Sequence, residues 1–383
     1  MVRLNLKVPT LLIFSAAMAF HLMISFLPLY INQELHYTLI EATYWTGIIQ
    51  LVASGLFAAC APFTGILCDR FGTKKIMMLI GFGNIIVYAG MAASTNVLHL
   101  VVFRGLQGAF GGFSTVMFTL VASTVPAQEL RKALSYQLAA LILGSVISPG
   151  IGGFFASIIG YRLTFLTSSL MFAALTPVIF WLKIPPPINN ENKKSRLKIA
   201  DVKATMPDFF ALVLVYICIS FINPATPWFL KSLGVPQEQL LTSAALVATI
   251  SGLAFAAATP FMTKKITDRT MPILSVMAAG AIFMTAFVNN AYQFVTLLAA
   301  IGAIQAGIPP SLLGGKNSGR GAIIGLLNSA RFTGMALGPF IATSILGDGE
   351  PPKVLYMFMA MSSISIMAAV VTYLTHARAK VKS

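Results

Sequence analysis

Long apolar stretches separated by short polar ones follow each other along the whole chain. Each apolar stretch has about the 20 residues that a helix needs to cross the hydrocarbon core of a membrane. Polar residues, glycine and proline gather between them and mark the turns. The pattern predicts an all-α membrane protein of twelve transmembrane helices, at 9–31, 42–64, 76–94, 98–121, 133–158, 162–182, 207–230, 240–262, 271–289, 292–312, 321–346 and 354–375.

The middle of the chain contains a polar segment rich in proline, asparagine and lysine. Such a composition is typical of a linker. We therefore expect a first six-helix bundle over 1–183, a cytosolic linker over 184–206 and a second six-helix bundle over 207–383.

The two predicted bundles resemble each other in sequence. Six helices return the chain to the same side of the membrane, so the two halves would be parallel repeats with the substrate site between them. Four similarities occur in one order and at nearly one offset: Ile24–Phe26 with Ile219–Phe221, Phe57–Phe63 with Phe255–Phe261, Gln107 with Gln305, and Gly144–Pro149 with Gly334–Pro339.

Composition and charge agree with a membrane protein. The 383 residues are 57% hydrophobic and 10% charged, with a mean hydropathy of +0.83, whereas soluble domains have about 25% charged residues. Of the 26 basic residues, 21 fall in segments on the side of the termini, 3 in the opposite segments and 2 inside helices. The positive-inside rule therefore predicts cytosolic termini in a multi-pass protein of the cytoplasmic (inner) membrane. The same rule accounts for the net charge of +15, so we do not expect a nucleic-acid partner.

Cysteine usage gives no sign of a metal site or a disulfide framework. Cys60, Cys68 and Cys218 lie in or beside apolar segments without metal-ligand spacing, as small buried hydrophobic residues do. The first apolar stretch is long enough to span and no cleavage pattern follows it, so we expect no cleaved signal peptide. No cofactor or metal is predicted.

The segment 65–75 combines two glycines, an acid and three bases between two apolar stretches. Gly65 and Gly72 would permit a tight turn. The segment resembles the G-x-L-x-D-R-x-G-R-K-K loop between helices 2 and 3 of the major facilitator superfamily of transporters, with Thr73 where a base is usual. The resemblance implies the major facilitator fold, in which Asp69 would close an inward gate against the start of helix 11 near Gly321. By the same resemblance, Arg70, Lys74 and Lys75 would latch neighbouring cytosolic helix ends in the outward-open state. For the two lysines, the positive-inside topology alone explains as much.

Arg104 lies within the fourth predicted helix, three residues before Gln107 and among glycines. An arginine at membrane depth costs at least about 2.5 kcal/mol, so it needs a wet cavity or a partner. The segment is similar to the R-x-x-Q-G motif of the drug:proton antiporter branch of that superfamily, which implies a role in proton coupling. The alternative is an arginine bonded to backbone carbonyls at a helix contact.

The fifth predicted helix carries Gly144, Pro149, Gly152 and Gly153. Proline permits a bend and the glycines give a thin packing face. The segment resembles the G-x-x-x-G-P-x-x-G-G antiporter motif of the same branch, with Ser148 in place of one glycine, and Gly338 and Pro339 repeat part of it. The resemblance implies export, while generic helix packing is the alternative.

Other polar side chains at membrane depth are candidates for the cavity, because such placements are costly. His21 could carry a proton near neutral pH, or it could be a neutral histidine bonded to a neighbouring helix. Asn223 could also line the cavity. Pro224 and Pro227 lack an N–H group, so backbone groups near Asn223 would be free of their helical hydrogen bonds. The remaining candidates are Ser25, Gln305 and Arg331.

All eleven acidic residues fall in loops or at predicted helix ends. A cavity with Arg104 and Arg331 and no buried acid should repel cations. We therefore expect a neutral or anionic amphipathic substrate. The proton would be carried by His21 or Glu41, or coupling would differ from that of the antiporter branch.

These features favour a secondary active transporter that exports small amphipathic compounds by alternating access, as multidrug-type proton antiport. The alternative is an uptake or facilitative carrier for a small metabolite or organic anion. An enzyme is not expected because the four histidines are scattered, and a receptor is not expected because no long soluble segment exists. We expect a monomer whose partners are substrate, protons and membrane lipid.

Overall fold

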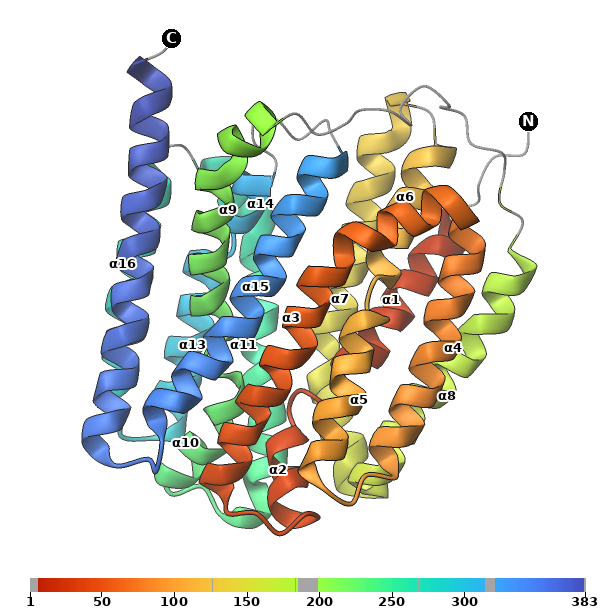
Figure 1. Ribbon diagram of the computed structural model, residues 1–383. Coiled ribbons are helices and arrows are strands. Elements are labelled where there is room, and N and C mark those ends of the chain that lie inside the picture. The colour runs from red at the N-terminus through yellow and green to blue at the C-terminus, as the bar shows by residue number, and fades with distance from the viewer. Residues whose placement is uncertain are drawn as a thin grey trace.

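In the computed structural model, the described residues are 6–125, 127–182, 184, 199–266, 269–313 and 321–381, and they form helices and connecting segments without strands. The helices run roughly side by side, and α1 begins and α16 ends at the same side, the top of Figure 1. Their bounds are α1 Lys7–His21, α2 Leu27–Gln33, α3 Leu39–Phe71, α4 Thr73–Ala92, α5 Val97–Ala109, α6 Phe113–Thr124, α7 Ala127–Ile159, α8 Tyr161–Trp181, α9 Ile199–Ser220, α10 Thr226–Ser232, α11 Leu240–Lys265, α12 Thr270–Met284, α13 Ala291–Gln305, α14 Ile308–Leu313, α15 Gly321–Leu346 and α16 Pro351–Val381, with short 3-10 turns at Asn223–Ala225, Gln237–Gln239 and Thr285–Phe287.

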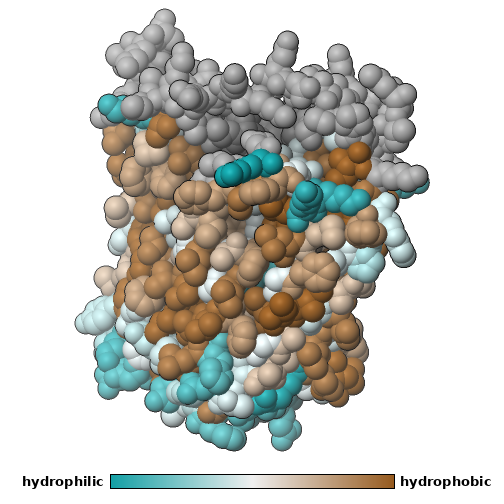
Figure 2. Space-filling model, turned by 45° about the vertical axis from the view of Figure 1, so that its right-hand side comes forward, coloured by the Kyte–Doolittle hydropathy of each residue, from teal (hydrophilic) through white to brown (hydrophobic). Residues whose placement is uncertain are grey.

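The predicted twelve passes are confirmed. Within the described residues, eight segments are long and apolar enough to cross a membrane. Three further passes are pairs of shorter helices joined at a break, namely α1 with α2, α5 with α6, and α13 with α14, and α15 is the remaining pass. Figure 2 shows the matching hydrophobic band across the middle of the molecule, above a hydrophilic end.

Two boundaries differ from the prediction. The segment 65–75 was expected to be a turn, but Gly65 lies within α3, which continues to Phe71. One residue, Gly72 with φ of 87°, makes the whole connection to α4, because a glycine tolerates this conformation without strain. Most of the predicted linker lies outside the described residues, and its last part, from Ile199 on, belongs to α9.

The repeated sequence becomes a repeated helix contact. A Cβ atom added at Gly144 of α7 would lie 2.6 Å from the carbonyl oxygen of Phe14 in α1. A Cβ atom added at Gly334 of α15 would lie 2.5 Å from the carbonyl oxygen of Val213 in α9. Each half therefore packs its glycine-rich helix against the backbone of its own first helix, which only small residues permit.

The α1–α7 contact is closest at Gly152, where an added Cβ atom would collide with the carbonyl group of Leu22. We expect Gly152→Ala to push the two helices apart and to cost about 1–3 kcal/mol of stability. The measurement is the apparent melting temperature of the purified protein. Gly55→Ala is the matched control, because an added Cβ atom there meets nothing within 4 Å. An equal melting temperature for the two variants would contradict the contact.

Candidate functional site

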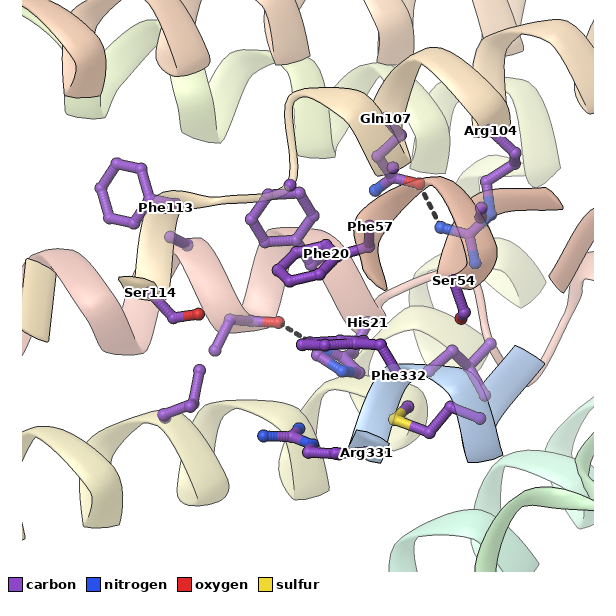
Figure 3. Close-up of a pocket in the computed structure, with 18 of the residues that line it drawn as sticks. Phe20, His21, Ser54, Phe57, Arg104, Gln107, Phe113, Ser114, Arg331 and Phe332 are labelled. Carbon is purple, nitrogen blue, oxygen red and sulfur yellow. Dashed lines mark hydrogen bonds between the residues drawn. The ribbon is translucent and has the colours of Figure 1, made fainter. Parts of the chain in front are cut away.

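A cavity lies at the middle of the bundle, between α1, α3, α5, α6, α7 and α15 (Figure 3). Its volume is about 820 Å³, including space open to solvent. Most of its wall is apolar or aromatic. The lining residues are Ile13, Ala16, Ala17, Phe20, His21, Ile24, Gln50, Ala53, Ser54, Phe57, Arg104, Gln107, Gly108, Gly111, Phe113, Ser114, Leu141, Arg331, Phe332 and Met335.

Arg104 of α5 is buried, with 7% of its surface exposed, and its guanidinium group bonds to neutral side chains. Its guanidinium group donates to the side-chain oxygens of Gln107 and of Gln50, the latter at 3.1 Å. Gln107 in turn donates to the hydroxyl of Tyr88, and Gln50 donates to Ser54 at 2.7 Å. This network fixes the guanidinium group beside the cavity and leaves its Nε atom without a hydrogen-bond partner. The partners are therefore side chains, and the backbone-carbonyl alternative is not what the structure shows.

Glycines bring α5 close enough to α3 for this network. An added Cβ atom at Gly108 would collide with the carbonyl group of Ala53, and one at Gly111 would collide with the ring of Phe57. The chain then breaks between α5 and α6. Asn84 of α4 donates to the carbonyl oxygen of Phe110 at 3.3 Å, which satisfies a backbone group that the break frees.

His21 ends α1 and lines the cavity. Its Nδ1 atom lies 2.8 Å from the carbonyl oxygen of Ala17. A carbonyl only accepts hydrogen bonds, so Nδ1 must donate, and in the neutral ring Nε2 is the acceptor. His21 can therefore take up a proton at Nε2. The sequence also allowed a neutral His21 bonded to a neighbouring helix. In the structure, the hydrogen bond of the ring is to Ala17 in the same helix, α1.

The break after α1 is held by α7. Ser25 donates to the carbonyl oxygen of Pro149 at 2.7 Å, and Ser148 donates to that of Met18. Ser25 is buried and is not among the lining residues. Its hydroxyl thus positions the backbone around His21 instead of contacting the cavity.

The second half of the chain contributes α15 to the cavity, through Arg331, Phe332 and Met335. The guanidinium carbon of Arg331 lies 5.1 Å from the ring centre of Phe332 and 5.7 Å from that of Tyr216. These distances suit cation–π contacts. The Nε atom of Arg331 is buried without a hydrogen-bond partner.

Three candidates lie elsewhere. Asn223, predicted to line the cavity, is exposed at the start of a 3-10 turn and is not a lining residue. Gln305 is buried in α13 outside the cavity lining, and its Oε1 atom has no partner. Glu41 caps α3 by accepting hydrogen bonds from the backbone and the hydroxyl of Thr38. The Glu41 carboxylate therefore caps a helix and is not among the groups that line the cavity.

The predicted gate is described in part. The side chain of Asp69 and those at the start of α15 lie outside the described residues. Arg70 is exposed beside Phe71, and Lys75 is also exposed. Lys74 donates to the carbonyl oxygen of Leu182 at 3.1 Å, which joins α4 to the end of α8 in the same bundle.

Sequence reasoning missed Gln50 and Ser54, which complete the Arg104 network. Both lie in the apolar stretch of α3, one helical turn apart. Polar residues at this spacing share a helix face. Two polar residues at this spacing in an otherwise apolar stretch could therefore have indicated that this face of α3 borders the cavity.

The two halves meet from the level of the cavity towards the side opposite the termini. The rings of Phe57 and Phe332 lie 3.7 Å apart beside the cavity. Nearer the opposite side, Gly47 of α3 packs against Thr343 of α15, and Gly153 of α7 packs against Ala245 of α11. We infer that the side opposite the termini is closed in this conformation.

A disulfide can test this closure. An added Cβ atom at Gly47 would lie 3.2 Å from Cβ of Thr343, close to the range of about 3.5–4.5 Å in disulfides. With the three native cysteines replaced by serine, we expect Gly47→Cys with Thr343→Cys to cross-link under mild oxidation. Loss of maleimide-reactive thiols measures the bond. Gly55→Cys with Thr343→Cys is the control and should stay reduced; equal labelling of both pairs would contradict the closure.

Comparisons with known proteins agree with this architecture. The family model described as Major Facilitator Superfamily matches residues 10–314. The multidrug resistance protein MdtG of Yersinia enterocolitica is 27% identical over 363 residues, covering 89% of this chain and 86% of the relative. MdtG of Proteus mirabilis is 26% identical over 315 residues, covering 78% of this chain and 77% of the relative.

Solved structures share the fold at low sequence identity. A bacterial homologue of the human lysosomal transporter Spinster, in an inward-facing and occupied conformation, has a TM-score of 0.76 at 13% identity over 97% of this chain and 96% of its own. A D-xylose–proton symporter has a TM-score of 0.75 at 16% identity over 96% of both chains. Together with the twelve passes and the central cavity, the family match shows that this chain is a multi-pass membrane transporter that belongs to the major facilitator superfamily.

Proposed function

We propose that this transporter exports small amphipathic compounds, neutral or anionic, by alternating access. The observation that carries the proposal is a largely apolar cavity whose wall comes from both halves of the chain. The R-x-x-Q-G and glycine–proline segments add the resemblance to the drug:proton antiporter branch, and the relatives named multidrug resistance proteins support export.

Rocking of the two halves would open the cavity to each side in turn. The side opposite the termini is closed by contacts at glycines, such as Gly47 and Gly153. Small residues let helices approach and separate without unpacking large side chains. On the other side, the resemblance assigns the gate to Asp69 near Gly321 and the latches to Arg70, Lys74 and Lys75.

We further propose that both termini lie in the cytosol and that the protein is a monomer of the cytoplasmic membrane. The start of α1 and the end of α16 share one side of the bundle (Figure 1). The excess of basic residues in the segments on that side favours the cytosolic assignment. One chain encloses a complete cavity, so a second copy is not required.

Proton antiport needs a group in the cavity that changes charge, and His21 is our candidate. Arg104 and Arg331 are the other charged or readily titrated lining residues, and arginine stays protonated. An uptake or facilitative carrier for an organic anion is the second candidate function. The pair of arginines without an acidic lining residue favours it as much as it favours export of an anion.

Transport into inverted membrane vesicles distinguishes the two directions. With an acidic lumen, we expect the exporter to accumulate Nile red or 8-anilino-1-naphthalenesulfonate, and not the permanent cation ethidium. Arg104→Ala should lower the rate about tenfold or more because the network around the guanidinium group is lost. Ethidium accumulation that Arg104→Ala leaves unchanged would contradict the proposal, and accumulation confined to right-side-out vesicles would indicate uptake.

The His21→Ala variant tests the proton site. We expect it to lose the response of transport to an imposed pH gradient, because arginine is then the only titratable residue type among the described residues that line the cavity. The purified variant should keep the apparent melting temperature of wild type, which shows that a lost response is not a loss of folding. An unchanged response to the gradient would exclude His21 as the proton carrier.

A further inference from the structure

Two positive charges face one cavity without an acidic partner. Arg104 comes from α5 in the first half of the chain and Arg331 from α15 in the second. No acidic side chain is among the described residues that line this cavity. The described residues form ion pairs between Arg162 and Glu34 and between Lys353 and Asp348, and these pairs involve neither cavity arginine.

The charge of Arg104 is held in place but not neutralised. Gln50 and Gln107 offer amide oxygens, which orient a guanidinium group but carry no net charge. An uncompensated charge removed from water is strongly destabilising. A guanidinium group has five N–H donors, and the buried Nε of Arg104 remains without a partner.

Arg331 is similarly uncompensated. Its described neighbours are the rings of Tyr216 and Phe332, and its Nε atom also lacks a hydrogen-bond partner. Arg104, His21 and Arg331 all line the cavity. In Figure 3, Arg104 and Arg331 lie on different sides of the His21 ring. The three residues therefore border one positively charged part of the cavity.

Resting on the proposed function, we infer that the cavity binds an organic monoanion. Its carboxylate or sulfonate lies in the space bordered by Arg104, His21 and Arg331. Its apolar body packs against the aromatic rings that line the same cavity, those of Phe20, Phe57 and Phe332.

The chemistry of guanidinium groups supports this ligand class. Their planar set of donors matches the oxygens of carboxylate and related anions, and charged hydrogen bonds are stronger than neutral ones. Because the two arginines belong to different halves of the chain, the anion also attracts both halves. Binding of the anion would thus favour closure of the cavity around it, whereas the empty cavity places two like charges across the interface.

Binding to the purified full-length protein in nanodiscs tests the inference without transport. Calorimetry compares 2-naphthoate, 2-naphthamide and 2-naphthylmethylammonium, which share an aromatic body and differ in head-group charge. We expect 2-naphthoate to bind at least tenfold more tightly than the amide, and the ammonium compound more weakly than both. Arg104→Gln and Arg331→Gln should each weaken binding of 2-naphthoate at least tenfold and leave the affinity for 2-naphthamide within about threefold.

Two controls separate charge from folding. Arg104→Lys and Arg331→Lys keep the charge and should retain the preference for 2-naphthoate over the amide. Arg162→Gln removes one positive charge at the rim of the bundle, where Arg162 pairs with Glu34 at 3.3 Å. It should leave the affinity for 2-naphthoate unchanged.

The outcomes separate this inference from the proposed direction of transport. Equal affinities for the acid and the amide, or no binding of the acid, would overturn the inference even if vesicles export a neutral compound. A loss of 2-naphthoate binding in Arg162→Gln equal to that in the cavity variants would also overturn it. A preference for 2-naphthoate that depends on both cavity arginines, together with transport only inward, would support the anion site and refute export.

Discussion

Hydrocarbon cannot hydrogen-bond to a peptide group, and this constraint determines where the helices of this protein are interrupted. Irregular backbone at membrane depth is tolerated where protein buries it or where it borders a cavity. The breaks at 22–26 and 110–112 both adjoin the central cavity, beside His21 and Gly111. The carbonyl of Phe110 accepts a hydrogen bond from Asn84 of α4, and Ser25, inside the other break, donates to the carbonyl of Pro149 in α7. The cavity therefore lies where neighbouring helices can support an interrupted backbone.

The same helices that support the breaks also join the two halves. On α7, Gly144 and Gly152 face α1, while Gly150 and Gly153 face α11 of the other half. One glycine-rich helix thus contacts both its own half of the chain and the other half. On α15, Gly338 packs against Ile217 of α9, and Thr343 packs against Gly47 of α3. The duplicated sequence produces the same two-sided arrangement twice.

The number of passes and the duplication could be predicted because they depend on apolar length and on similarities that extend over the chain. Arg104, Gln107, His21 and Arg331 could be picked out because polar residues at membrane depth are rare, and the structure places all four at one cavity. Asn223 and Gln305 satisfied the same criterion but line no part of it. Because polar residues are rare at membrane depth, the sequence shows which side chains are costly to bury. Whether such a side chain points into the cavity depends on how its helix is rotated about its own axis.

The limits of the sequence are clearest in the segment 65–75. Two glycines predicted a tight turn over this segment, yet Gly65 continues a helix and Gly72 alone reverses the chain. Local composition does not distinguish these roles because both conformations are open to glycine. Gln50 was missed for a related reason. It matters through its hydrogen bond to Arg104, which is 54 residues away in sequence.

The uncompensated arginines also bear on the energy source. A carrier that takes a monoanion out of a cell with a negative interior moves charge down the electrical gradient, and this releases about 2.3 kcal/mol per 100 mV. In exporters of cations that use a buried carboxylate, substrate and proton compete for one negative group. Here the two arginines would hold the anion, and for antiport His21 would carry its proton inward in the other half of the cycle. Exchange of one monoanion outward for one proton inward would move two charges down the electrical gradient in each cycle.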